Sequence, residues 1–229
     1  MIDPVWTPLL LSLKVAGCAT LLASVAGVAI AYALAKWPGR LTDVVDALLS
    51  LPLVLPPTVI GYYLLVVFGS QGVIGAWLGR LGIQLVFTWQ GAVIAAAVVA
   101  LPLVLRSART AFEGVDPELE RAARALGVSE WTVFLHISLS LARPGIMAGV
   151  LLAFARALGE FGATLMLAGS LPGKTQTLSI AIYEAVQAGD DATATTLVIV
   201  TSAVCVAVLL TAGRLVPRSL GRRRRAASH

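Results

Sequence analysis

The chain has 229 residues, of which 58% are hydrophobic and 13% are charged, and its formal net charge is +5. Soluble domains carry about 25% charged residues, and a water-soluble fold with this composition would expose large apolar patches that cause association. The composition therefore excludes an ordinary soluble enzyme, a disordered tail and a secreted disulfide scaffold. It predicts a protein that resides in a lipid bilayer.

Five segments are apolar and long enough to span the hydrocarbon of a bilayer, which takes about 20 residues in a helix. We expect these spans at residues 8–35, 44–68, 87–105, 144–168 and 192–213. The first is longer than a signal-peptide core and has no basic segment before its apolar run, so we expect it to remain as a span. The chain is thus predicted to be an all-α membrane protein with about five transmembrane helices in a single domain, residues 1–229.

The second predicted span contains Pro52, Pro56 and Pro57 in its first half. Each proline removes a backbone hydrogen-bond donor and disfavours a helical conformation in the residue before it. In a bilayer, the carbonyl groups that these prolines free need partners within the protein or in a water-lined cavity. Two interpretations stay open: an ordinary proline kink, or a broken helix beside a transport pathway. On the second interpretation, Pro56 and Pro57 are candidate pathway or gate residues.

The connection between the third and fourth spans, residues 113–141, carries signals for two short helices. Asp116 is a typical N-cap, Pro117 suits the first helical position, and Glu118 places an acid in the first turn. A mostly small, apolar stripe follows at helical spacing: Leu119, Ala122, Ala123 and Leu126. Gly127 is typical of the position after a helix end, and Ser129 can cap a second helix. This segment is predicted to form a helix–turn–helix on the inner face of the membrane.

Basic residues are distributed unequally between the two sides of the predicted spans. Thirteen of the 17 Lys and Arg residues belong to one side, which includes residues 113–141 and the run Arg222–Arg225, whereas Arg80 and Lys174 belong to the other. Cytoplasmic loops carry the excess of Lys and Arg. We therefore expect the N-terminus outside and the C-terminus in the cytoplasm. The same distribution indicates membrane orientation rather than nucleic-acid binding.

One part of the connection resembles the EAA loop of ABC-importer permeases. The matching stretch is Glu120-Arg121-Ala122-Ala123-Arg124-Ala125-Leu126-Gly127, followed ten residues later by Ile137-Ser138-Leu139. The resemblance implies a coupling helix that inserts into a groove of an ATP-binding subunit, and it makes these residues candidate contacts: Glu120, Arg121, Ala122, Ala123, Leu126 and Gly127. The sequence departs from the family pattern at Arg121, where a glutamate is usual, and at Ser140, where a proline is usual. The alternative is a solvated amphipathic helix at the membrane surface.

Two further stretches resemble molybdate-importer permeases. One is LPLVLPPTVIGYY at residues 51–63, and the other is AFARALGEFGAT at residues 153–164, followed by LPGKTQT at residues 171–177. The resemblance covers about residues 9–210 and implies the type I ABC-importer permease fold. It also makes Gly162 and Thr164 candidate residues of the translocation pathway or its gate.

The family resemblance further implies partners and a location. The expected assembly contains a second copy of the chain, an ATP-binding cassette ATPase dimer that holds ATP and Mg, and an extracytoplasmic oxyanion-binding protein, all at the bacterial inner membrane. This chain is expected to bind no cofactor itself and to be a transport subunit rather than an enzyme. Molybdate is the expected substrate, with tungstate or sulfate as alternatives.

Two opposite charges lie near the middle of the fourth predicted span. Arg156 and Glu160 are four residues apart and would share one face of a helix. A lone charge at that depth costs at least about 2.5–3.5 kcal/mol. One interpretation is a mutual ion pair that packs helices, and the other is that Arg156 borders the anion route while Glu160 restrains it. Gly162 leaves room for close approach of helices.

No nucleotide, metal or catalytic site is expected in this chain. Residues 169–175, GSLPGKT, are one residue short of the P-loop spacing and lie on the predicted outer side. The only histidines are His136 and His229, and Cys18 and Cys205 lie in separate apolar runs, so neither a metal site nor a disulfide is predicted. Another class remains open, a secondary anion transporter that works without ATP. Recovery of an ATPase with the tagged chain separates the two classes.

Overall fold

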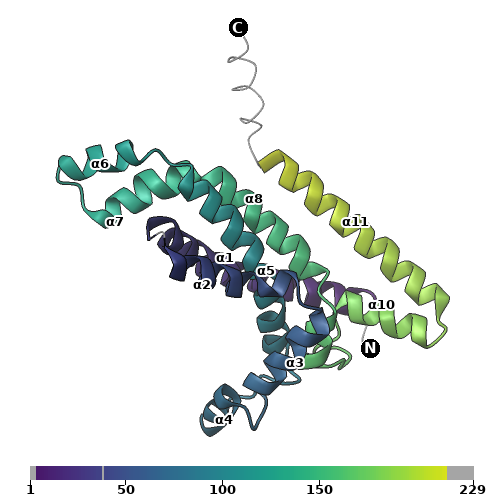
Figure 1. The fold of residues 1–229 in the computed structure, drawn as a ribbon. Coiled ribbons are helices and arrows are strands. Elements are labelled where there is room, and N and C mark those ends of the chain that lie inside the picture. The colour runs from purple at the N-terminus through teal and green to yellow at the C-terminus, as the bar shows by residue number, and fades with distance from the viewer. Residues whose placement is uncertain (1–3, 38, 216–229) are drawn as a thin grey trace.

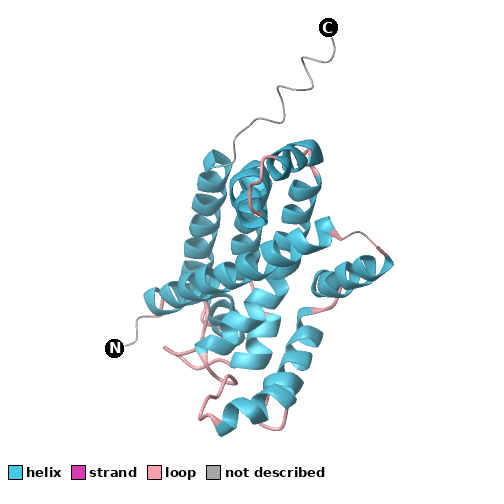
Figure 2. Cartoon of the chain, turned by 90° about the vertical axis from the view of Figure 1, so that its left-hand side faces the viewer, coloured by secondary structure: helices cyan, strands magenta, loops and turns pink. Residues whose placement is uncertain are grey.

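The computed structural model describes residues 4–37 and 39–215, which form helices joined by loops (Figure 2). In chain order the helices are α1 (Trp6–Lys36), α2 (Arg40–Ser50), η1 (Leu51–Leu53), α3 (Pro57–Phe68), α4 (Val73–Arg80), α5 (Trp89–Glu113), α6 (Pro117–Ala125), α7 (Glu130–Val133), η2 (Phe134–Ser138), α8 (Leu139–Leu158), α9 (Gly162–Ala168), α10 (Leu178–Gln187) and α11 (Asp191–Leu215). η1 is a 3-10 helix and η2 is a π-helix. Arg218, Arg222–Arg225 and His229 lie outside the described residues.

Four helical runs in the described chain are long and apolar enough to cross a membrane. They are α1, α5, the continuous run from Glu130 to Leu158, and α11. These runs correspond to the first, third, fourth and fifth predicted spans, and the prediction of an all-α membrane protein is confirmed. The run that matches the fourth predicted span differs from it in its limits. It begins at Glu130 rather than at residue 144, and it ends at Leu158 rather than at residue 168.

The second predicted span is not one helix. Residues Arg40–Leu53 and α3 meet at an angle of 111°. The prolines explain the break. Pro56 has an extended backbone, with ψ at 138°, and Pro57 is the first residue of α3, where a missing N–H is tolerated. The chain therefore turns sharply before α3, so that α2 and α3 run in different directions (Figure 1).

The core of the molecule is formed where α5 packs against both α1 and α8 (Figure 1). Its buried residues are mostly alanines: Ala16, Ala19, Ala23, Ala92, Ala96, Ala97, Ala100, Ala153 and Ala157. Small side chains let membrane helices approach closely, so van der Waals contacts hold them together. α11 packs on α10 and α8 at the edge of this core, and most of its surface is exposed in the chain alone.

A second close contact joins α3 to α9. A Cβ atom on Gly61 of α3 would lie 2.6 Å from the Cβ of Met166 and 3.1 Å from the Cα of Ala163, both in α9. The two short helices therefore pack at a distance that a larger residue at position 61 does not allow.

Gly61→Ala is expected to push α3 away from α9 and to lower the thermal unfolding temperature of the purified permease. Overpacking of this kind typically costs about 1–3 kcal/mol, and the nearby Ala163 Cα is backbone that cannot rotate away. Gly17→Ala in α1 is the control, because no atom lies within 4 Å of the added Cβ there. Equal unfolding temperatures for the two variants would contradict the contact.

Candidate functional site

The segment between α5 and α8 begins with a helix that is capped by its own residues. The carboxylate of Asp116 accepts a hydrogen bond from the backbone N–H of Glu118 (2.9 Å), and Pro117 is the first residue of α6. α6 ends at Ala125, and Gly127 then takes φ of 80°, a conformation that glycine adopts without strain. The predicted start and end of this helix are confirmed.

The second predicted helix, α7, begins after Ser129, whose hydroxyl accepts a hydrogen bond from the N–H of Thr132 (3.3 Å). It is tied to α6 by Arg124, which donates to the two carboxylate oxygens of Glu130 at 2.6 and 3.2 Å. α7 is not a separate short helix, because it continues through η2 into α8. The π-helical turn at η2 is of a kind that frequently occurs at functional sites.

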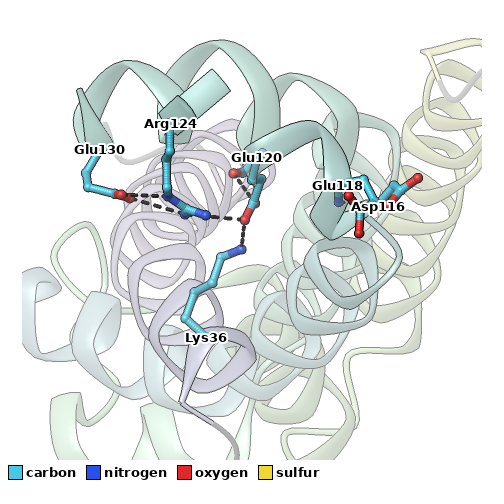
Figure 3. Close-up of polar contacts among 7 residues, drawn as sticks. Lys36, Asp116, Glu118, Glu120, Arg124 and Glu130 are labelled. Carbon is cyan, nitrogen blue, oxygen red and sulfur yellow. Dashed lines mark hydrogen bonds and ion pairs between the residues drawn. The ribbon is translucent and has the colours of Figure 1, made fainter. Parts of the chain in front are cut away.

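Glu120 points from α6 into the protein, with 3% of its surface exposed (Figure 3). Its carboxylate accepts hydrogen bonds from Lys36, the last residue of α1, and from the hydroxyl of Ser138 in η2 (2.6 Å). Burial raises the pKa of Glu120, but the hydrogen bonds from Lys36 and Ser138 and the charges of Lys36 and Arg124 outweigh it, so the pKa lies below its ordinary value. Glu120 is therefore ionised at neutral pH. Glu120 is a candidate contact with an ATP-binding subunit, and within this chain its carboxylate already contacts Lys36 and Ser138.

Exposed apolar side chains occupy other positions on α6 and α7. We call these four residues the coupling surface: Leu119, Ala122, Leu126 and Trp131. Leu126 is 84% exposed and Trp131 is 69% exposed. Of the other candidate contacts, Arg121 and Gly127 are exposed and Ala123 is half-buried. Arg121 also donates to Glu118 on the surface of α6 (2.8 Å).

The second group of candidates lies at the break between α8 and α9. Arg156 Nη1 lies 2.7 Å from Glu160 Oε2, so the two charges form an ion pair. Glu160 lies beyond the end of α8 at Leu158, not in the middle of a helix. Its other oxygen accepts a hydrogen bond from the N–H of Ala163 (2.9 Å) in the first turn of α9. Glu160 thus balances Arg156 and caps α9, a second role that the sequence analysis missed.

The structure brings two distant candidate stretches together. A Cβ atom on Gly162, the first residue of α9, would lie 2.9 Å from the Cβ of Pro57, the first residue of α3. The two short helices therefore begin side by side, and helix N-termini carry partial positive charge. Thr164 is buried in α9, whereas Pro56 and Pro57 are exposed.

The stretch that superficially resembles a P-loop forms a closed turn. The carbonyl oxygen of Leu171 accepts hydrogen bonds from the N–H groups of Lys174 and Thr175 (2.9 Å each) and of Gln176 (3.3 Å). A P-loop instead points successive N–H groups at a phosphate, so this turn cannot cradle one as it stands. Among residues 4–37 and 39–215, no group of three or more His, Cys, Asp and Glu side chains is placed to hold a metal ion.

The family model that matches the chain has the description "Binding-protein-dependent transport system inner membrane component" and covers residues 23–225. Because this match spans most of the chain, the chain belongs to this family of multi-pass inner-membrane transport proteins.

Similar proteins include molybdenum permeases. The molybdenum transport system permease protein ModB of Escherichia coli (strain K12) is 47% identical over 212 residues, which cover 91% of this chain and 92% of that protein. The putative molybdenum transport system permease protein YvgM of Bacillus subtilis (strain 168) is 45% identical over 191 residues, covering 81% and 82%. The sulfate transport system permease protein CysT of Escherichia coli (strain K12) is 38% identical over 155 residues, covering 68% of this chain and 55% of that protein.

Solved structures of similar fold are ABC transporters. An inward-facing structure of the MetNI methionine ABC transporter superimposes with a TM-score of 0.72 at 16% identity, covering 91% of this chain and 93% of that one. A bacterial alginate ABC transporter in complex with a pentasaccharide-bound periplasmic protein gives a TM-score of 0.73 at 17% identity, covering 93% and 78%. The predicted type I ABC-importer permease fold is confirmed, and the chain is a transport subunit of an ABC importer.

Proposed function

We propose that this permease carries molybdate into the cytoplasm and is driven by an ATP-binding subunit that docks on the coupling surface. The observation that carries the proposal is the coupling surface itself, four exposed apolar residues on helices that the chain caps and anchors. Exposed apolar patches of this kind mark interaction sites. The docked ATPase would hold ATP and Mg, and this chain would bind neither.

The similar proteins support molybdate as the substrate. Two molybdenum permeases are 47% and 45% identical to this chain over more than four-fifths of its length, whereas the sulfate permease is 38% identical over 68% of it. These figures favour molybdate over sulfate. Tungstate has the same charge and nearly the same shape as molybdate, so we expect both anions to be carried.

The fold supports the remaining proposed partners, and the charges support the proposed orientation. A second copy of the chain would complete the route at the interface between the two copies, with an extracytoplasmic oxyanion-binding protein at the outer face. Arg121, Arg124 and Arg143 accompany the coupling surface, which supports a cytoplasmic location for it. The N-terminus would then lie outside and the C-terminus in the cytoplasm.

The anion route would pass the break between α8 and α9. Arg156 is 34% exposed there, and it is paired with Glu160. α3 and α9 begin beside each other nearby, and the N-terminal ends of broken membrane helices can face anionic groups. Glu160 would prevent Arg156 from holding a divalent anion tightly, so that the anion is released into the cytoplasm. ATP binding would draw the two coupling surfaces together and open this route outward, and hydrolysis would reset it.

Reconstitution of the permease with its ATPase and binding protein in liposomes tests this function. We expect ATP-dependent uptake of labelled molybdate, with tungstate competing at similar concentrations and sulfate competing only in large excess. Uptake by the chain alone, without an ATPase, would make it a secondary transporter. Stronger competition by sulfate than by tungstate would assign it to sulfate.

A further inference from the structure

Glu120 links α6 to α1. These two helices are far apart in the sequence, and no short loop joins them. α6 is joined to α5 by the short turn at residues 114–116, and α7 continues into η2 and α8. Lys36, by contrast, is 84 positions from Glu120 in sequence and is the last residue of α1. The ion pair between Lys36 and Glu120 is thus a side-chain link between α6 and α1 (Figure 3).

The same junction is reinforced by aromatic rings. The ring centroid of Tyr32 in α1 lies 5.3 Å from that of Phe112 in α5 and 4.6 Å from that of Phe134 in η2. Both ring pairs meet edge-on. The ring centroids of Trp131, in the coupling surface, and Phe134 lie 5.6 Å apart, with the rings tilted by 37°. Lys36 lies over the ring of Tyr32 at 5.6 Å. Edge-on ring pairs are directional contacts, so the rings and the ion pair together join α1 to the base of the coupling surface.

A buried carboxylate tolerates the loss of its partners poorly. Glu120 is 3% exposed, and an uncompensated charge at such a depth is strongly unfavourable. The carboxylate therefore keeps Lys36 and Ser138 close as long as it remains ionised, and its lowered pKa keeps it ionised at neutral pH. These contacts would therefore keep α1, α6 and η2 together when α6 moves.

From these contacts we infer that Glu120 is a positioning residue that makes α1 follow the coupling surface during transport. The inference rests on the proposed docking of an ATPase at that surface. Movement imposed on α6 passes to α5 and α8 through the chain, and it passes to α1 through the link of Glu120 with Lys36. Without this link, the ATPase still docks and hydrolyses ATP, but α1 stays behind and less substrate moves per ATP.

The first test measures molybdate imported per ATP hydrolysed in the reconstituted complex. Lys36→Gln and Glu120→Gln are expected to lower this ratio at least fivefold, with ATP hydrolysis within twofold of wild type. Lys36→Arg keeps the cation and is expected to keep the ratio. Arg40→Gln is the matched control, because it removes one positive charge from the same membrane surface without touching Glu120. A wild-type ratio in Lys36→Gln would overturn the inference.

The second test measures movement directly. Spin labels at Ala29→Cys in α1 and Ala125→Cys in α6, both exposed positions, report the distance between the two helices after Cys18 and Cys205 are replaced by alanine. We expect one narrow distance that is the same with and without ATP, and a broadened or shifted distance after Glu120→Gln. A distance that changes with ATP while Glu120 is intact would contradict a rigid link.

The proposed function and the role of Glu120 are tested separately. If no ATPase co-purifies with the wild-type permease, the proposed function is wrong. If the ATPase binds and the Lys36→Gln variant imports normally per ATP, only the role of Glu120 is wrong. Lys36 lies outside the coupling surface, so this variant answers the question even if Glu120→Gln disturbs the fold of α6.

Discussion

Leu126→Asp is expected to release the ATP-binding subunit from the permease. Leu126 has the most exposed of the three large side chains of the coupling surface, at 84%, so it contributes little to the fold of the free chain. Burial of a leucine at an interface contributes about 1.5–3 kcal/mol, and an aspartate there would also lose its hydration. We therefore expect association to weaken about 100-fold or more, since each 1.4 kcal/mol is tenfold.

Co-purification and a binding titration in nanodiscs measure this effect. Leu81→Asp is the matched control, because Leu81 is also exposed but follows α4, far from α6 and α7 (Figure 1). Leu81→Asp should retain the ATPase. Equal retention of the ATPase by both variants would show that the docking site lies elsewhere on the chain.

The ion pair at the end of α8 is expected to matter for both stability and transport. Arg156→Gln or Glu160→Ala leaves one charge without its partner, and Glu160→Ala also removes the acceptor for the N–H of Ala163. Breaking a fully buried pair costs about 3–5 kcal/mol, and the cost is smaller here because the Arg156 side chain is 34% exposed. Both single variants should therefore unfold at lower temperature than wild type.

The double variant Arg156→Gln/Glu160→Gln separates packing from transport. It contains no unpaired charge, and a glutamine at position 160 can still accept from the N–H of Ala163. We expect it to assemble and to take up molybdate at least tenfold more slowly, because the positive charge beside the proposed route would be gone. Arg109→Gln/Glu113→Gln/Asp46→Asn is the control, because Arg109 lies 2.8 Å from Glu113 and 3.4 Å from Asp46, so that this variant also removes a cation together with its acidic partners. It should transport normally. Normal uptake by the Arg156/Glu160 double variant would leave the pair with a packing role only.

The features predicted best from the sequence depend on neighbouring residues. Asp116, Pro117, Gly127 and Ser129 were placed correctly at helix ends because a cap acts on an N–H two or three residues away. Four membrane spans were found because hydropathy over about 20 residues is a local sum. The prolines at 52, 56 and 57 indicated a disturbed span, but the angle of 111° depends on packing by other helices.

Of the two features that the sequence did not predict, the direction of Glu120 depends on a distant partner, whereas the break at Glu160 depends on nearby residues. The inward direction of Glu120 is set by Lys36 and Ser138, and Lys36 is 84 positions away in sequence. Glu160 was placed on a continuous helix because the spacing of four from Arg156 suits one. An acid three residues before Ala163, between Gly159 and Gly162, was the available signal that a new helix begins there.

In the proposed complex, the local caps of α6 and α7 would also affect how tightly an ATPase binds. A flexible loop would have to order itself during each encounter, and that loss of conformational entropy would weaken the complex. Here Asp116 and Ser129 cap the two helices, Arg124 joins them, and Glu120 fastens them to the protein. In the proposed complex, the docking element would therefore be preorganised, so that little conformational entropy would be lost when an ATPase binds.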